Sequence, residues 1–199
     1  VKIALASPTG RAAKRLSESA LHHASTLHRL LKFDPFKGGF VYNEDHPLNC
    51  QYLIVDEASM LDTGLASAML RAIPADAHLL LVGDVNQLPS VGPGNVLNDL
   101  IQHADIPVVR LEQVYRQRET SNIVTTAHAV LGGQSSPPRI ARGLNELDAR
   151  WDLQFIPATD PETCVELVET LVSKWIPERL GTYDPIRDVQ VLAPMHRGT

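Results

Sequence analysis

The chain has 199 residues, of which 44% are hydrophobic and 21% are charged, and its formal net charge is −5 at pH 7. These values are ordinary for one large or two small globular domains. No apolar run approaches the roughly 20 residues that a membrane span needs, and no signal-peptide pattern opens the chain. The two cysteines, Cys50 and Cys164, lie far apart in the sequence. We therefore expect a reduced, cytoplasmic protein that does not enter a membrane.

The charges are unevenly distributed along the chain. Residues 1–37 carry seven Lys or Arg and two acidic residues, a net charge of +5, so the remaining residues carry −10. The negative total argues against a protein that coats nucleic acid. A basic segment on an acidic body nevertheless suggests a local anionic partner, and the alternative is a solvated helix face.

Short apolar runs alternate with helix-like segments in the first half of the chain. We predict strands over residues 1–6, 52–55, 79–82 and 107–111. We predict helices over residues 11–17, 25–31, 63–73 and 95–103, and a loop or hairpin over 33–47. Continuously apolar strands that alternate with helices are typical of an α/β fold, in which helices cover both faces of a parallel sheet.

The same pattern restarts beyond residue 117. Helices are predicted over 119–131 and 161–176, and strands over 153–156 and 189–193, which would make a second α/β unit. We place the boundary near 112–118 and predict two domains, residues 1–112 and residues 113–199.

Three of the predicted strands end in polar residues. The segments are Ser7-Pro8-Thr9, Asp56-Glu57 and Gly83-Asp84. In a parallel sheet the carboxyl ends of the strands meet at one edge, and ligands bind there. We therefore expect these three segments to form one site.

Asp56 and Glu57 are adjacent carboxylates at the end of an apolar strand. Partly burying two like charges is costly unless a cation compensates them. A nucleotide hydrolase needs such a pair, because Asp56 can hold Mg²⁺ on the phosphates and Glu57 can polarise the water that attacks the γ-phosphate. The alternative is that one of the two residues merely starts the following helix.

Other polar residues extend this hypothesis. Asp84 would lie beside the metal and Gln87 towards the γ-phosphate, although their loop also resembles an ordinary Asx turn. Arg116 can neutralise charge on a transferring phosphoryl group, and Tyr115 can stack on a base. Surface packing is the usual role of such residues when they occur in isolation.

Two further segments carry candidates for phosphate or nucleic-acid contacts. Residues 7–11 end a strand and open a helix, so their amide groups suit phosphate binding, unless Thr9 is only a helix cap. Residues 26–29 offer another hydroxyl group and another basic side chain. His22, His23 and His28 lie close together, but no Cys or acid completes a metal-ligand set, so surface or packing roles are expected for them.

In this order, the segments resemble the motifs of superfamily 1 DNA helicases, specifically the RecD-like and TraA-like 5′–3′ enzymes. ASPTGRAAKRL resembles motif Ia, STLHRLL motif Ib, LIVDEASML motif II, LVGDVNQLPSVGPGNVL motif III and LEQVYRQ motif IV. VLAPMHRGT resembles the segment that enters the later motifs. The resemblance spans nearly the whole chain, and the combination of DEAS with GDxxQLPSVGxG is highly specific.

The resemblance implies a partial RecA-like P-loop NTPase motor domain over residues 1–112 and the start of a second one over 113–199. It implies ATP and Mg²⁺ as cofactors and 5′–3′ movement on single-stranded DNA with unwinding of duplex DNA in recombination or repair. Such a protein works alone or with RecB- and RecC-type subunits. The implied nucleotide-site residues are Asp56 on Mg²⁺, Glu57 as catalytic base, Gln87 and Arg116 on the γ-phosphate, Tyr115 near the adenine, and Asp84. The implied DNA-binding residues are Pro8, Thr9, Gly10, Arg11, Thr26 and His28.

The phosphate-binding pattern G-x-x-x-x-G-K-[ST] is absent from the sequence. In this family it precedes the segment that resembles VKIALASP, so we expect an internal fragment of a longer helicase that does not hydrolyse ATP by itself. One alternative is a non-hydrolysing DNA-binding or scaffold module. Another is a metal-dependent nuclease that uses Asp56, Glu57 and Asp84.

The resemblance also implies that the phosphate-loop strand lies between the strands predicted over 79–82 and 107–111. Without it, the strand over 79–82 has an unpaired edge. We expect one of three outcomes: strand 107–111 moves next to it, another segment fills the gap, or a second chain pairs there. Self-association is the outcome we favour.

Overall fold

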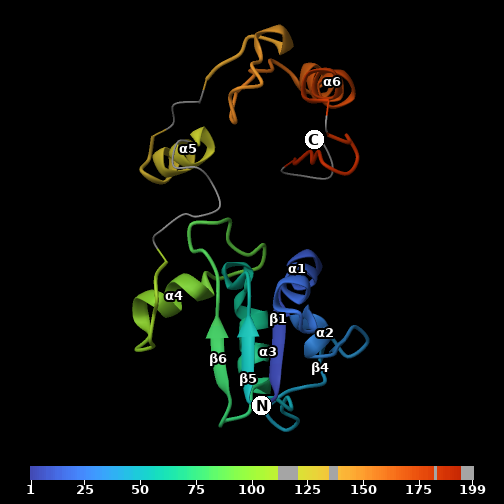
Figure 1. Cartoon of the computed structure of the whole chain (residues 1–199). Helices are drawn as coiled ribbons and strands as arrows, with labels where there is room; N and C mark the ends of the chain where they lie inside the picture. Colours follow the sequence, from blue (N-terminus) through green and yellow to red (C-terminus); the bar gives the residue numbers. More distant parts are fainter. Residues whose placement is uncertain (112–120, 135–138, 182, 194–199) are drawn as a thin grey trace. The chain divides into compact units, whose positions relative to one another are not determined.

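The computed structural model describes residues 1–111, 121–134, 139–181 and 183–193 of the chain. The chain divides into two compact units, Val1–Arg110 and Leu111–Thr199 (Figure 1). Their interpretation as parts of two motor domains stays a prediction.

A parallel sheet forms the centre of the first unit. Within the described residues it has four strands in the order β2-β1-β5-β6, and every neighbouring pair is parallel. The strands are β1 (Ile3–Ser7), β2 (Ala24–Thr26), β5 (Tyr52–Val55) and β6 (His78–Leu81). Figure 1 shows the arrowheads of β5 and β6 side by side at the same end of the sheet. The predicted α/β fold, a RecA-like parallel sheet flanked by helices, is confirmed.

The main hydrophobic core lies between the sheet and the helices α2 (Leu27–Leu30) and α3 (Thr63–Ala72). Leu53 and Val55 of β5 are fully buried in it. Residues spaced by three or four positions share one side of a helix. The buried side of α3 is made in this way, by Leu65, Met69 and Ala72. The apolar run of β5 and the helical spacing in α3 thus meet in one core.

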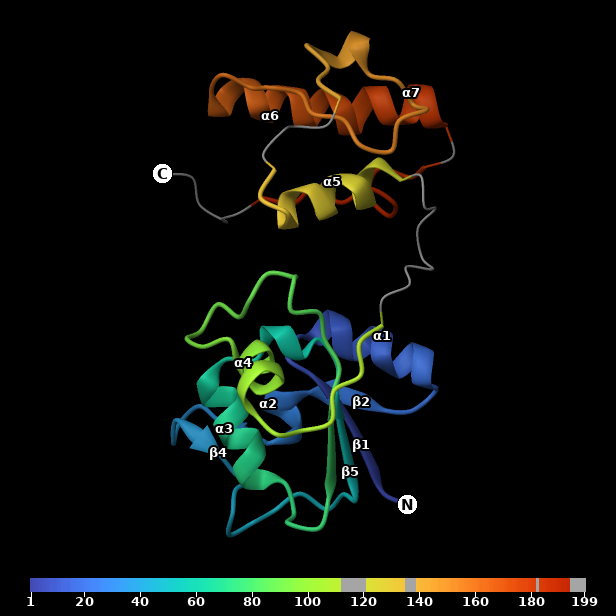
Figure 2. The ribbon, with the colours of Figure 1, turned by 90° about the vertical axis from the view of Figure 1, so that its left-hand side faces the viewer.

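The structure confirms two other helices that were predicted in the first unit. α1 (Gly10–Ala20) contacts β1 and β2 (Figure 2). Thr9 caps its start, because the Thr9 Oγ1 accepts the N–H of Ala12 at 3.3 Å. α4 (Val96–His103) occupies the helix predicted over 95–103. A hairpin of β3 (Phe33–Asp34) and β4 (Gly39–Phe40) forms within the segment that was predicted as a loop or hairpin.

The helix predicted over residues 25–31 is only partly correct. Its first residues belong to β2, which pairs with β1 from Ala24 opposite Leu5 to Thr26 opposite Ser7. The sequence Ala-Ser-Thr has no apolar alternation, so a search for hydrophobic period finds no strand there. β2 forms because its backbone groups find partners on β1, which is a tertiary effect.

The strand predicted over residues 107–111 is wrong. These residues have no regular secondary structure, and Val109 and Leu111 are largely exposed. An apolar run becomes a strand only when a neighbouring strand satisfies its backbone groups. In the described part of the chain, β6 pairs with β5 alone, so neither 107–111 nor another described segment covers its second edge.

The described residues of the second unit are mainly helical. The helices are α5 (Asn122–Leu131), the short η2 (Leu144–Glu146), α6 (Pro161–Thr170), the π-helical turn η3 (Leu171–Trp175) and α7 (Ile176–Leu180). They confirm the helices predicted near 119–131 and 161–176, and the second one continues to Leu180. In the part of the chain that the structure describes, no helix has the length and apolar character needed to cross a membrane.

The two strands predicted in the second unit are wrong. Phe155 forms a single parallel bridge with Ile140, and residues 189–193 have no regular secondary structure. Polar contacts hold the chain between Ile140 and Phe155 instead. Asp148 accepts a hydrogen bond from the Arg150 guanidinium at 2.7 Å, and this bond holds the pKa of the Asp148 carboxyl well below its usual range.

The free edge of β6 carries both unpaired backbone groups and apolar side chains. The N–H groups of His78 and Val82 donate to Gln51 and Val55 on the β5 side, each at 2.8 Å. Since amide directions alternate along a strand, the N–H groups of the intervening residues 79 and 81 point away from β5. The Leu80 side chain is 54% exposed. Self-association through this edge stays a prediction.

We expect the 199-residue chain to associate with itself in a concentration-dependent way, measurable by sedimentation. Leu80→Lys places a charge beside the edge and removes an apolar side chain, so it should weaken the association by about tenfold or more. Leu70→Lys on α3 is the matched control, since Leu70 is 53% exposed but belongs to a helix. A chain that stays monomeric at high concentration, or equal effects of the two substitutions, would contradict the prediction.

Candidate functional site

The carboxyl ends of the strands meet at one edge of the sheet, as the sequence predicted. Ser7 at the end of β1 lies opposite Thr26 at the end of β2. The N–H of Asp56 donates to the carbonyl of Ala6 at 2.9 Å, which brings the end of β5 next to the end of β1. The N–H of Ala58 donates to the carbonyl of Val82 at 2.9 Å, which joins the same segment to the end of β6. The three predicted polar segments are therefore neighbours.

The strand order separates the candidate residues into two groups. Thr26 and His28 follow β2, and residues 8–11 follow β1, so all the predicted DNA-binding residues lie on one side of the edge. Asp56 and Glu57 follow β5, and the segment with Asp84 and Gln87 follows β6 on the other side. The predicted DNA-binding residues thus follow β2 and β1, and these predicted nucleotide-site residues follow β5 and β6.

Glu57 has an unusual backbone conformation. Its φ and ψ are 55° and 39°, in the left-handed region, which a residue with a side chain adopts at a cost of about 1–2 kcal/mol. The Oδ1 of Asp56, which is half-buried, accepts the N–H of Glu57 at 2.9 Å and helps to hold this turn. A backbone outlier of this kind is often found at functional positions. The conformation turns the chain from β5 into the short helix η1 (Ala58–Met60).

The alternative that Asp56 or Glu57 merely starts a helix does not account for these side chains. Glu57 precedes η1, but its carboxylate makes no capping hydrogen bond there. The following helix α3 is capped by Asp62, whose Oδ1 accepts the N–H of Leu65 at 2.7 Å. The two carboxylates at the strand end are thus not required for starting either helix.

The predicted residues after β6 lie in an exposed loop, 83–95. The Oδ1 of Asp84 accepts the N–H of Asn86 at 2.9 Å, and the Asp84 carbonyl accepts the N–H of Gln87 at 3.1 Å. The Asx turn that the sequence allowed is therefore present, and it fixes Gln87 relative to Asp84. The Gln87 side chain is exposed, as a residue that contacts a ligand must be.

The oxygen ligands at this edge fit a magnesium ion that is bound partly by the protein and partly by the phosphates of a nucleotide. The described residues contain no group of three or more His, Cys, Asp or Glu side chains arranged to hold a metal by themselves. Mg²⁺ in nucleotide enzymes is commonly held by one or two carboxylates together with substrate phosphates. Asp56 alone at the end of β5 suits that role, whereas a nuclease that binds its metal with Asp56, Glu57 and Asp84 lacks structural support.

On the other side of the edge, two of the predicted DNA-binding hydroxyls cap helices. Besides the capping bond of Thr9, the Thr26 Oγ1 accepts the N–H of Arg29 at 3.3 Å at the start of α2. The His28 ring packs against Phe33 and Phe40, with each pair of ring centroids 5.8 Å apart. The capping role that the sequence left open for Thr9 is thus present, and DNA contacts of these residues stay a prediction.

Two of the predicted site residues lie outside the residues that the structure describes, and two residues that contact the site loop were not predicted from the sequence. Tyr115 and Arg116 lie in the first category. Asp62 and Thr63, which contact the end of the loop 83–95, lie in the second. Their sequence signal is weak, because an Asp-Thr pair before an apolar helix indicates a cap and nothing more.

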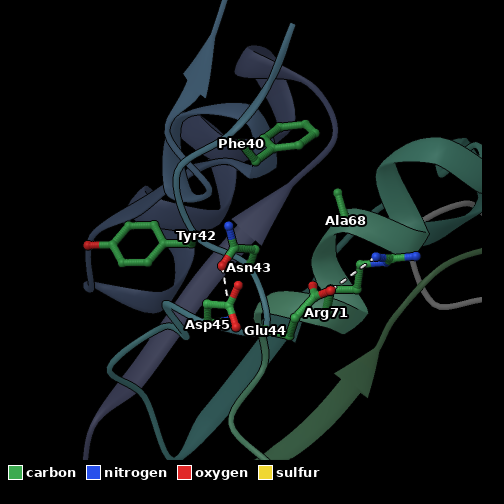
Figure 3. A pocket seen from close by; sticks show the side chains of 7 residues that line it. All are labelled: Phe40, Tyr42, Asn43, Glu44, Asp45, Ala68 and Arg71. Carbon is green, nitrogen blue, oxygen red and sulfur yellow. Dashed lines mark hydrogen bonds and ion pairs between the residues drawn. The ribbon is translucent and has the colours of Figure 1, made fainter. Parts of the chain in front are cut away.

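A pocket of about 300 Å³ lies away from the strand ends, between α3 and the chain that follows β4 (Figure 3). Arg71 of α3 and Glu44 form an ion pair across it at 3.2 Å. None of the side chains that line it is a predicted site residue: they are Phe40, Tyr42, Asn43, Glu44, Asp45, Ala68 and Arg71. The candidate site is thus an open sheet edge, distinct from this pocket.

The left-handed conformation of Glu57 makes a prediction about stability. Glycine adopts this region freely, whereas a β-branched residue is strongly disfavoured there. Glu57→Val should therefore unfold at lower urea than Glu57→Gly, with a free energy of unfolding lower by about 1–2 kcal/mol. The same pair at Ser67, an exposed position within α3, should show the opposite order, since Gly is the poorer helix former. Equal stabilities of the two Glu57 variants would show that the backbone there is not strained.

Comparison with known proteins gives both a family model and relatives. Residues 1–93 match the family model described as an AAA domain. The ATP-dependent RecD2 DNA helicase of Deinococcus radiodurans is 44% identical over 135 residues, which cover 68% of this chain and 18% of that protein. The RecBCD enzyme subunit RecD of Haemophilus influenzae is 33% identical over 157 residues, covering 68% of this chain and 24% of that protein. The ATP-dependent DNA helicase dda of Enterobacteria phage T4 is 30% identical over 149 residues, covering 71% and 34%.

The chain therefore spans between 18% and 34% of the length of these three relatives. The region matched by the family model contains all four strands of the sheet and the polar segments at their ends. Motifs, strand order and relatives agree on one family. The chain belongs to the RecD-like superfamily 1 helicases.

Proposed function

We propose that this chain is part of an ATP-dependent DNA helicase that couples ATP hydrolysis to movement along single-stranded DNA. One observation carries the proposal. The Asp56-Glu57 pair and the loop with Asp84 and Gln87 follow neighbouring parallel strands and are joined by the bond from Ala58 to Val82. This is the arrangement that the γ-phosphate chemistry of a nucleotide hydrolase requires.

Each residue at the nucleotide side has a distinct role in this proposal. Asp56 would hold Mg²⁺, which when bound neutralises charge on the phosphates. Glu57 orients and polarises the attacking water from the turn that follows β5, where its backbone is held in the left-handed region. Gln87 contacts the γ-phosphate from the exposed loop. Arg116 and Tyr115 would complete the site from the start of the second motor domain, on the phosphate and the adenine.

The DNA side of the edge supports movement along a strand. Residues 8–11, Thr26 and His28 lie at the ends of β1 and β2, within the basic first part of the chain. Backbone and stacking contacts suit a translocase, since they depend little on base sequence. We propose 5′–3′ movement, unwinding of duplex DNA, and a place in recombination or repair, from the resemblance of the motifs to those of the RecD-like and TraA-like enzymes.

The relatives differ in how they assemble. One is named a helicase in its own right and another is named a subunit of the RecBCD enzyme. The proposal accommodates both a stand-alone helicase and one that works with RecB- and RecC-type subunits. A cytoplasmic location, as expected from the sequence, is part of the proposal.

Glu57→Gln in the full-length protein should leave ATP binding intact and lower DNA-stimulated ATP hydrolysis by at least about 100-fold, because the amide cannot polarise the water. The measurement is phosphate release with single-stranded DNA, together with nucleotide binding. Glu166→Gln on the exposed side of α6, a residue with no predicted role at the site, removes the same charge and should hydrolyse ATP at the parental rate. Parental hydrolysis by the Glu57 variant would disprove the role of Glu57.

The 199-residue chain should bind single-stranded DNA weakly, with a slope of log K against log salt of about −1 to −3, as expected for few phosphates. Arg11→Ala should weaken binding to different sequences equally and make the slope shallower by about 0.7. Arg71→Ala is the control, because it removes the same charge from an arginine that pairs with Glu44 and is not a predicted DNA-binding residue. A strong dependence of affinity on base sequence would favour a specific DNA-binding module instead.

A further inference from the structure

The loop 83–95 carries Gln87, and Val85 near its start is partly buried against the hydrophobic core. Leu88 and Val91 on either side of the loop's middle are almost fully exposed. Its local hydrogen bonds fix Gln87 relative to Asp84, not relative to the sheet edge. The position of Gln87 therefore depends on how the two ends of the loop are attached.

The first attachment is a close backbone contact at Gly83. A Cβ at this position would lie 2.9 Å from the amide nitrogen of Ser59 and 2.8 Å from a methyl carbon of Leu97. A side chain at residue 83 would therefore push the loop away from η1. Together with the bond from Ala58 to Val82, this contact attaches the start of the loop directly after Glu57.

The second attachment is made by Thr63, the first residue of α3. Its N–H donates to the Pro93 carbonyl at 2.9 Å, and its Oγ1 donates to the same carbonyl at 3.0 Å. The first N–H groups of a helix lack partners within the helix, so Pro93 satisfies one of them. The hydroxyl adds a second bond that the backbone alone cannot supply.

Two glycines allow this approach. Gly94 has φ of +104°, and a Cβ there would clash with the Thr63 Oγ1. A Cβ at Gly92 would lie against the carboxylate of Asp62, and the Ser90 Oγ donates to the Gly92 carbonyl at 2.8 Å. The segment 90–94 is thus fitted to the start of α3, and Thr63 lies only six positions after Glu57.

We propose that Thr63 is a positioning residue that sets the place of Gln87 relative to Glu57 through its two hydrogen bonds to Pro93. The inference rests on the proposed ATP hydrolysis and adds a residue to that site. Both ends of the loop are attached to the chain between Glu57 and Thr63, so the γ-phosphate contact and the catalytic base share one support. Loss of the Thr63 hydroxyl removes one of the two bonds that hold the far end of the loop and leaves the near end in place.

The test uses the full-length protein and three substitutions on α3. Thr63→Val keeps the shape and the backbone bond but removes the hydroxyl, Thr63→Ser keeps the hydroxyl, and Ser67→Ala is an exposed control one turn further along. One lost hydrogen bond should reduce kcat for ATP hydrolysis by about 3- to 10-fold in Thr63→Val. The KM for ATP, the Tm, and both other variants should stay close to the parent.

Two further measurements separate positioning from a merely structural role. Thr63→Val should reduce the preference for a non-hydrolysable ATP analogue over ADP without changing ADP affinity, since Gln87 contacts only the γ-phosphate. Combined with Gln87→Ala, Thr63→Val should cause no further loss, because the two residues act through one contact. Amide exchange within residues 84–95 should be faster in Thr63→Val.

The outcomes distinguish this inference from the proposed function. If Glu57→Gln and Gln87→Ala both hydrolyse ATP like the parent, the proposed function fails and the role of Thr63 fails with it. If those two variants are impaired but Thr63→Val matches the parent in kcat and nucleotide preference, only the positioning role is wrong. Unchanged amide exchange, or additive losses in the double variant, would also overturn it.

Discussion

The parallel pairing of β5 with β1 on one side and β6 on the other is the constraint on which the candidate site depends. Val55 at the end of β5 lies level with Leu81 at the end of β6 and with Ala6, so β1 extends only one residue further, to Ser7. Burial fixes this register, because a slip by one residue would move Leu53 and Val55 of β5 out of the core. The hydrophobic core therefore decides which polar residues meet at the sheet edge.

The site combines a rigid part with an adaptable one. Glu57 is held in a left-handed conformation between a buried strand and η1, a strain that only a well-packed surrounding can maintain. Gln87 lies in an exposed loop that is attached at its ends and free in its middle. A fixed residue in the proposed role of catalytic base and an exposed residue in the proposed role of γ-phosphate contact suit the proposed helicase, which must respond to the loss of that phosphate on each cycle.

The sequence predicted those elements whose information is local or periodic. Apolar runs identified β5 and β6, and the apolar spacing of residues on one face identified α3. β2 was missed because its three residues carry no apolar pattern and depend on pairing with β1. The run at 107–111 was assigned to a strand for the opposite reason, since it has the composition of a strand but no described partner.

The same limit applies to the candidate site. Spacing and residue type were sufficient to predict that Asp56, Glu57 and Asp84 meet at one edge, because that follows from parallel strands. The left-handed backbone of Glu57 could not be predicted, since no Gly or Asn marks the position. The contact of Thr63 with Pro93 joins residues thirty positions apart, and no local pattern encodes it. Tyr115 and Arg116, outside the described residues, stay predictions from family resemblance.

The order of the strands also limits how ATP and DNA can influence one another in such a protein. β1 lies between the strand end with Thr26 and the strand end with Asp56, and the bond from Asp56 to Ala6 joins the two sides. A hydrogen-bonded sheet with a packed core changes shape very little, so it transmits position without much movement. A change in nucleotide state must then appear in the segments that leave the sheet, namely the helix starts after β1 and β2 and the loop after β6. The residues proposed to contact DNA and the γ-phosphate lie in these segments, and Leu27 at the start of α2 and Val85 in the loop connect both segments to the core.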